Sequence, residues 1–221
     1  MKLFTMLVKY DQTVPHAIEV FKANRDANTD GWGCKDIGLN LEATRQLISL
    51  MKATKKPTYM EIMAETPEAC RKSAQFAIDA GVDVVIGGHY DEETASLLAR
   101  ADIEYYPFIG RLEGNPRTLY GEIDDIVSEA IETSQKNISG VTLAVYRYEG
   151  NQEQLLHSLV QKLDKPLFVA GSVNSEKRIK QLKSLGVAGI TIGTSFFDSD
   201  FVSSGSFTDN VNKAKQWIEE C

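Results

Sequence analysis

Ionisable side chains follow the apolar runs of this 221-residue chain, each at the point where a run ends. His89 comes directly after VVIGG, and Lys9 follows LFTMLV. An imidazole titrates near neutral pH and therefore suits proton transfer at a carbon next to a carbonyl. A lysine removed from water can act as a general base or an imine-forming nucleophile, whereas a charged lysine can stabilise an enolate. The polar side chains at such ends are Lys9, Tyr10, Asp11, Asn40, Glu65, His89, Tyr90, Asp91, Arg111, Glu113, Arg147, Glu149, Ser172, Asn174, Thr194 and Ser195.

Two carboxylates are candidates for a catalytic acid or base. Glu61 lies inside TYMEIMAET, a run that is otherwise mostly apolar, and Glu65 lies near its end. A carboxylate in a buried strand must be paired, or its pKa rises and it becomes useful in proton transfer. The alternative interpretation is a structural ion pair of Glu61 with Lys35 or Arg147.

Two arginines also stand at the ends of apolar runs. Arg111 follows PFIG and Arg147 follows LAVY. A guanidinium group in either place could hold a second anionic group or a carbonyl oxygen of a ligand. Packing of Arg147 over the rim of the fold is the alternative. For His89 and Lys9 the alternatives are hydrogen bonding within a loop and exposure to solvent.

Small residues interrupt the last two apolar runs. The run Pro166–Ala170 ends at Gly171-Ser172, and the run Gly189–Ile192 ends at Gly193-Thr194-Ser195. If both runs are neighbouring parallel strands, bare backbone N–H groups lie side by side at their ends. Such N–H groups, with a helix N-terminus behind them, bind phosphate. We therefore expect Gly171, Ser172, Gly193, Thr194 and Ser195 to bind a phosphate dianion.

Eight short apolar runs alternate with segments of helical periodicity along the whole chain. Near-continuous apolar runs predict strands of a sheet that is covered on both faces, and intervening helices make the strands parallel. About eight such units, with the phosphate pattern on the last two, predict a single (β/α)₈ barrel, a TIM barrel, over residues 1–221. Its expected strands are Leu3–Lys9, Cys34–Asn40, Thr58–Ala64, Val82–Gly88, Ile103–Gly110, Val141–Tyr148, Leu167–Gly171 and Gly189–Gly193.

The segment VAGSVNSEKRI, followed by LGVAGITIGTSF, resembles the phosphate-binding loops of the ribulose-phosphate-binding barrel superfamily. That superfamily includes phosphosugar epimerases, the tryptophan synthase alpha subunit, indole-glycerol-phosphate synthase and a glycerol-3-phosphate-responsive antiterminator. The resemblance covers about a seventh of the chain in detail, and it implies a phosphate-binding barrel without specifying a reaction. Ser172 stands where these proteins often have a second glycine, and its hydroxyl could donate to the phosphate instead.

Charge, apolar runs and cysteine content indicate which binding partners and which cellular compartment to expect for this protein. The formal charge of −7 argues against a nucleic-acid partner, which would need clustered lysine and arginine. No run approaches the ~18 apolar residues of a membrane span. Three cysteines without metal-ligand spacing, Cys34, Cys70 and Cys221, are typical of a reducing compartment, so we expect a cytoplasmic protein.

The expected function is that of an isomerase, epimerase or aldolase-type lyase acting on a small phosphorylated sugar or polyol. Proton transfer would involve His89 with Glu61 or Glu65, while Lys9 or Arg111 stabilises the enolate or carbonyl oxygen. A non-catalytic barrel that senses a phosphorylated metabolite is the alternative, and a flavin-binding barrel ranks third. No cofactor and no His-rich metal site are expected, although a carboxylate-held Mg²⁺ and assembly into a homo-oligomer stay open.

Overall fold

The computed structural model describes residues 1–114 and 116–220 and confirms the predicted single (β/α)₈ barrel. Eight parallel strands form a closed sheet in which β1 pairs with both β12 and β4. The strands are β1 (Lys2–Met6), β4 (Gly31–Lys35), β5 (Thr58–Ile62), β6 (Val84–His89), β7 (Glu104–Phe108), β10 (Val141–Leu143), β11 (Leu167–Ala170) and β12 (Gly189–Ile192).

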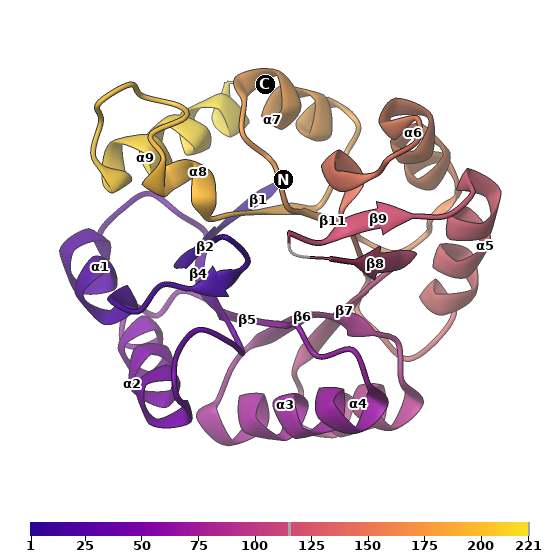
Figure 1. The fold of residues 1–221 in the computed structure, drawn as a ribbon, viewed down its shortest axis with the longest axis horizontal. Coiled ribbons are helices and arrows are strands. Elements are labelled where there is room, and N and C mark those ends of the chain that lie inside the picture. The colour runs from indigo at the N-terminus through magenta and orange to yellow at the C-terminus, as the bar shows by residue number, and fades with distance from the viewer. Residues whose placement is uncertain (115, 221) are drawn as a thin grey trace.

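Helices surround the barrel on all sides (Figure 1). Their starts follow local sequence signals: the Thr66 side chain caps α3 directly before Pro67, and Ser206 and Asp209 form a capping box on α9. The helices are α1 (Ala17–Asn24), α2 (Leu41–Lys52), α3 (Pro67–Ala80), α4 (Glu92–Arg100), α5 (Ile123–Ser134), α6 (Gln152–Lys162), α7 (Glu176–Ser184), α8 (Thr194–Phe197) and α9 (Phe207–Glu219), with a 3₁₀ turn at Val145–Arg147.

Stacked aromatic rings fill the barrel at the N-terminal ends of its strands. The Phe4 ring lies 3.8 Å from the Tyr59 ring and 5.3 Å from the Phe168 ring. Tyr106 stacks on Phe168 at 4.1 Å. Gly189 makes room for this cluster, because a Cβ atom there would lie 2.7 Å from the Phe4 ring. This end of the barrel is therefore a packed hydrophobic core, and the polar groups gather at the other end.

Two short hairpins lie over the C-terminal end of the barrel, near its axis (Figure 1). The first pairs β2 (Val8–Lys9) with β3 (Gln12–Thr13), directly after β1. The second pairs β8 (Arg111–Glu113) with β9 (Thr118–Tyr120), directly after β7. Both hairpins add walls to the barrel mouth that a simple strand–helix alternation would not provide.

Three of the predicted strands differ from the observed ones by three or more residues at one end or both. β1 ends at Met6 because the chain then turns into the first hairpin. β4 spans Gly31–Lys35 rather than Cys34–Asn40, so it begins three residues earlier than expected and ends five residues earlier. β10 ends at Leu143 because residues 145–147 form a 3₁₀ turn.

Cys34 and Cys70 are free and buried, whereas Cys221 lies outside the described residues. None of the helices within the described ranges combines the length and the hydrophobicity that crossing a membrane requires.

Candidate functional site

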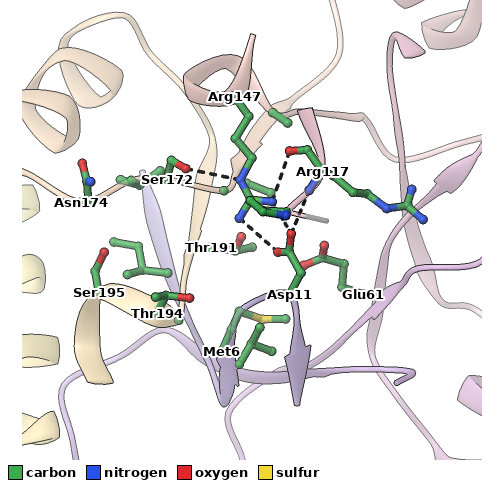
Figure 2. A pocket seen from close by; sticks show the side chains of 18 of the residues that line it. Met6, Asp11, Glu61, Arg117, Arg147, Ser172, Asn174, Thr191, Thr194 and Ser195 are labelled. Atoms are coloured by element: carbon green, nitrogen blue, oxygen red, sulfur yellow. Dashed lines mark hydrogen bonds and ion pairs between the residues drawn. The ribbon is translucent and has the colours of Figure 1, made fainter. Parts of the chain in front are cut away.

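A pocket of about 320 Å³ opens at the C-terminal ends of the barrel strands. The loops after β11 and β12 form one wall of this pocket, and the first hairpin with the ends of β4 and β5 forms the opposite wall (Figure 2). The polar residues that line it are Tyr10, Asp11, Lys35, Glu61, Arg117, Arg147, Ser172, Asn174, Thr191, Thr194, Ser195, Asp198 and Asp200. In barrels of this class, this end of the sheet carries the active site.

A buried lysine joins two buried carboxylates on one wall. The ammonium of Lys35 lies 2.9 Å from Oε1 of Glu61 and 3.1 Å from Oδ1 of Asp11. All three residues are at most 7% exposed. Glu61 points into the barrel because it follows Tyr59 by two residues, and residues at this spacing share one face of a strand. Lys35 has the same relation to Gly33, where a Cβ atom would collide with Met6 and Tyr59.

The Asp11 carboxylate accepts four hydrogen bonds. Arg147 donates two of them, to Oδ2 at 2.6 Å and to Oδ1 at 3.1 Å. Lys35 donates the third at 3.1 Å, and the backbone N–H of Arg117 donates the fourth, also at 3.1 Å. Burial alone would raise the pKa of Asp11, but the bonds from Arg147 and the charge of Lys35 outweigh it and lower this pKa below its ordinary value.

A strained turn brings Asp11 to this position. Tyr10 and Asp11 form the two-residue loop between β2 and β3, with φ values of 51° and 62°. Positive φ is costly for residues other than glycine and is tolerated best by Asp and Asn. The Thr13 hydroxyl fixes the hairpin to β4, since it accepts from the Lys35 N–H at 2.8 Å and donates to the Lys35 carbonyl. The fold thus holds the carboxylate in place at a conformational cost.

Backbone N–H groups form the opposite wall. Gly171 and Ser172 both have positive φ, 83° and 55°, which turns the chain away from β11 towards α7. Across residues 1–114 and 116–220, the N–H groups of Ser172, Val173 and Asn174 donate to no protein group. Those of Thr194 and Ser195 belong to the first turn of α8, where helical N–H groups lack an intrahelical partner. β11 and β12 are neighbours, so the two loops lie beside each other.

Arg147 connects the two walls, as Figure 2 shows. Its Nε donates to the Ser172 hydroxyl at 3.3 Å while its terminal nitrogens bind Asp11. Gly171 is required for this arrangement, because a Cβ atom there would lie 2.7 Å from Nε of Arg147. On the outer side of the same loop, Arg178 donates to the Ser172 carbonyl at 2.6 Å and to Oδ1 of Asn174 at 2.8 Å.

The structure brings seven of the predicted site residues together in this pocket and leaves four outside its lining. The seven are Glu61, Arg147, Gly171, Ser172, Gly193, Thr194 and Ser195, and the four are Lys9, Glu65, His89 and Arg111. The ion pair between Glu61 and Lys35, which the sequence left open as an alternative, is present.

Three of the residues outside the lining form ion pairs, and the partners of Lys9 and Glu65 themselves line the pocket. Lys9 pairs with Asp198 at 2.5 Å, because the hairpin carries it past the end of β1. Arg111 pairs with Glu113 at 2.6 Å on the second hairpin, and Glu65 contacts Arg117 at 3.3 Å.

His89 ends β6 but does not line the pocket. Gly87 and Gly88 before it have φ values of 86° and 63°, and the pairing of β6 with β7 is irregular at this point. The carbonyl of His89 accepts from the hydroxyl of Tyr105, a buried residue of β7. The double glycine thus changes the direction of the strand just before the imidazole.

Three important residues of the pocket were not predicted as site residues from the sequence. Lys35 was considered only as a partner of Glu61, Asp11 only as one of many polar strand-end residues, and Arg117 not at all. Lys35 had a usable signal, since the alternation Gly31, Gly33, Lys35 places a lysine on the same face as two glycines. Asp11 and Arg117 belong to the two hairpins, and no local sequence pattern predicts how these hairpins lie over the barrel.

Among the described residues, no group of three or more His, Cys, Asp or Glu side chains is placed to hold a metal ion. The position between Asp11 and Glu61, where a cation would be bound, holds the Lys35 ammonium.

Comparison with known proteins identifies the fold. No protein-family model and no curated protein sequence matches the chain. Among solved structures, a native KDPGal structure covers 100% of this chain and 95% of its own at 14% identity, with a TM-score of 0.70. The tryptophan synthase alpha chain from Legionella pneumophila covers 99% of this chain and 92% of its own at 12% identity, with a TM-score of 0.65.

A third neighbour is the N-acetylmannosamine-6-phosphate 2-epimerase from Clostridium perfringens, which covers 88% of this chain and 86% of its own at 13% identity, with a TM-score of 0.64. A phosphosugar epimerase and a tryptophan synthase alpha chain are also among the proteins whose loops the sequence resembles. At these identities the likeness extends to the fold alone. The chain has the (β/α)₈-barrel fold of these three neighbours.

Proposed function

We propose that this protein is an isomerase, epimerase or lyase that transfers a proton next to the carbonyl of a small phosphorylated sugar or polyol. One observation carries the proposal: a single pocket has free backbone N–H groups on one wall and a buried carboxylate–ammonium pair on the other. A phosphate bound to the first wall would place the carbon atoms of a short chain against the second. Binding energy from the remote phosphate would thereby position the reacting carbons.

Glu61 is the proposed general base. Its Oε1 is paired with Lys35, while no described residue donates to Oε2, so this second oxygen can accept a proton from a substrate carbon. Asp11 does not suit this role, because four donors already bind its carboxylate and keep it ionised. Of the two buried carboxylates, Glu61 is the one with an unused acceptor.

Lys35 is the proposed stabiliser of the developing oxyanion. Its ammonium has three N–H groups, of which one donates to Asp11, and it forms an ion pair with Glu61. An N–H group that is not bonded to Asp11 can donate to the carbonyl oxygen, whose negative charge grows as the neighbouring carbon loses its proton. Lys35 forms ion pairs with two carboxylates, and an ammonium held in ion pairs is not a nucleophile. This pairing supports enolate chemistry over an imine mechanism.

One of the neighbouring structures supports the substrate class, because its name is that of an epimerase of a phosphorylated sugar, N-acetylmannosamine 6-phosphate. The phosphate would bind the loops of Gly171–Asn174 and Gly193–Ser195, with the Ser172 hydroxyl as a further donor. Arg178, which contacts the Ser172 carbonyl, adds positive charge behind the first loop.

Solvent exchange tests the proposal directly. Ribulose 5-phosphate and N-acetylmannosamine 6-phosphate, incubated with the protein in D₂O, should gain deuterium at the carbon next to the carbonyl, as followed by proton NMR. Glu61→Gln should slow this exchange by about 100-fold or more, because general bases contribute that much, while binding is retained. Binding without exchange for every phosphorylated sugar tested would point to a regulatory barrel instead. Failure of every phosphorylated compound to raise the unfolding temperature would contradict the phosphate site.

A further inference from the structure

Every cation that lines the pocket is already paired with a protein carboxylate. Among the described lining residues the cations are Lys35, Arg117 and Arg147. Lys35 pairs with Asp11 and Glu61, Arg147 pairs with Asp11, and Arg117 pairs with Glu65. Four carboxylates line the same pocket, those of Asp11, Glu61, Asp198 and Asp200. No described cation of the lining is therefore free to bind a second anionic group of a ligand.

The two walls differ in whether their positive charge is already paired with a protein carboxylate. Behind the backbone N–H groups of the β11 loop, Arg178 binds a carbonyl and an amide oxygen and forms no ion pair with any described residue. Its charge is thus available to a bound anion. At the opposite wall the donors of Arg147 and Lys35 converge on Asp11, which is 7% exposed. One end of the pocket suits an anion, and the other end suits a neutral group.

Asp11 occupies the place that a ligand carboxylate would need. A carboxylate has about four acceptor positions, and Asp11 has four donors from three residues, so donors and acceptors match. A second carboxylate entering here would find these donors used and would face the negative charges of Asp11 and Glu61. Like charges brought together in this way oppose binding.

We infer that Asp11 is a specificity-determining residue that restricts the reacting end of the phosphorylated substrate to uncharged hydroxyl and carbonyl groups. Phosphorylated sugars and polyols are accepted on this account, whereas phosphorylated sugar acids and keto acids are rejected. The inference rests on the proposed phosphate site and adds the chemistry of the far end of the substrate. The strained backbone of Asp11, with its φ of 62°, agrees with a residue that is kept for function.

Matched ligand pairs test the inference without any mutation. Glycerol 3-phosphate and 3-phosphoglycerate differ by a CH₂OH group against a carboxylate, and so do sorbitol 6-phosphate and 6-phosphogluconate. In calorimetric titrations of the full chain, we expect each neutral-ended compound to bind at least about tenfold more tightly than its carboxylated partner, because of like-charge repulsion. Inorganic phosphate gives the baseline for the phosphate site alone.

Asp11→Asn tests the assigned residue. Asparagine tolerates a positive φ, so the turn is kept while the charge is lost. Arg147 is then without a carboxylate partner, and the affinity ratio within each ligand pair should fall by about tenfold. Asp198→Asn is the matched control, because it removes one negative charge from the same pocket and leaves Arg147 and Lys35 paired. This control should leave the ratio within about threefold of the wild type.

The outcomes separate this inference from the proposed function. If the carboxylated compounds bind as tightly as their neutral partners in the wild type, the inference is overturned and the phosphate site stands. If Asp198→Asn changes the ratio as much as Asp11→Asn, overall charge is responsible and the role of Asp11 is overturned. If neither member of any pair binds, the phosphate site fails and the inference fails with it.

Discussion

The two ends of the barrel interior are built from the same strands but by opposite principles. At one end Phe4, Tyr59 and Phe168 stack into a dry aromatic layer. At the other end, two residues further along β5, Glu61 faces Lys35. Tyr59 and Glu61 are two residues apart on β5, so both side chains point into the barrel, one into the aromatic layer and one into the charged layer. The aromatic layer stabilises the fold through apolar burial, whereas the charged layer removes three charges from water and compensates them only by pairing them with one another.

The largest expected effect belongs to the aromatic end. Phe4→Ala removes a ring that is completely buried and stacked on two others, and it should lower the free energy of unfolding by about 3–5 kcal/mol. Urea denaturation followed by circular dichroism measures this change. A loss below about 1 kcal/mol, less than most buried truncations cause, would show that the layer is not a tightly packed core.

The charged end should respond differently to single and double substitution. Lys35→Met leaves Glu61 buried without its cation and should cost about 3 kcal/mol in the free energy of unfolding. Adding Glu61→Leu removes the uncompensated charge, so the double variant should recover at least half of that loss.

A double-mutant cycle gives the interaction energy between Lys35 and Glu61 directly. It needs the free energies of unfolding of the wild type, the two single variants and the double variant, each measured by urea denaturation. Additive losses would mean that Lys35 and Glu61 do not compensate each other. Substitutions at the charged end would then affect the free energy of unfolding independently of one another, and the pairing of charges would not distinguish this end from the aromatic end.

Acidification should affect the charged end through Asp11. Its pKa is lower in the folded protein than in the unfolded chain, so its stabilising contribution is complete above about pH 4 and is lost as the pH falls further. The difference in unfolding free energy between wild type and Asp11→Asn should therefore be largest near neutral pH and should shrink below about pH 4. Urea denaturation at several pH values measures it.

Comparison with Asp11→Asn is essential in this experiment because Asp36, a half-buried carboxylate, responds in the opposite direction. Burial raises the pKa of Asp36, so its contribution favours the folded state as the pH falls. Asp36 is common to both proteins and cancels in the difference. A difference that stays constant from pH 7 to pH 3 would contradict the assignment of a lowered pKa to Asp11.

The smallest expected effect concerns His89. The imidazole lies at the end of β6 outside the pocket lining, so His89→Ala should leave the affinity for glycerol 3-phosphate within about twofold, as expected for a residue outside the binding site. Calorimetric titration checks this value. A clear loss of binding would show that His89 belongs to the binding site after all, as its place directly after VVIGG predicts.

The fold was predictable because its signals are local. Eight apolar runs separated by helical periodicity and glycine stops define the number and order of strand–helix units, and parallel strands with closure follow from them. The positions of Gly171 and Gly193 directly after β11 and β12 were predictable for the same reason, because a small residue that interrupts an apolar run is a local signal for the end of a strand.

The charged wall was not predictable in the same way. Asp11 reaches Arg147 across 136 positions of sequence, through a hairpin whose direction depends on the Thr13–Lys35 contacts. The local pattern of apolar and polar residues does not predict contacts between residues so far apart in the sequence. The shift of His89 away from the pocket depends likewise on how Gly87 and Gly88 turn in the assembled sheet.

The order of apolar and polar residues along the chain therefore determined the barrel, its parallel sheet and the two glycine loops at its end. Tertiary structure alone decided which ionisable groups meet there: Asp11, Lys35 and Glu61 do, and His89 does not. The physical reason is that burial patterns depend on near neighbours in sequence, whereas a cluster of charges depends on where distant loops are folded back over the strands.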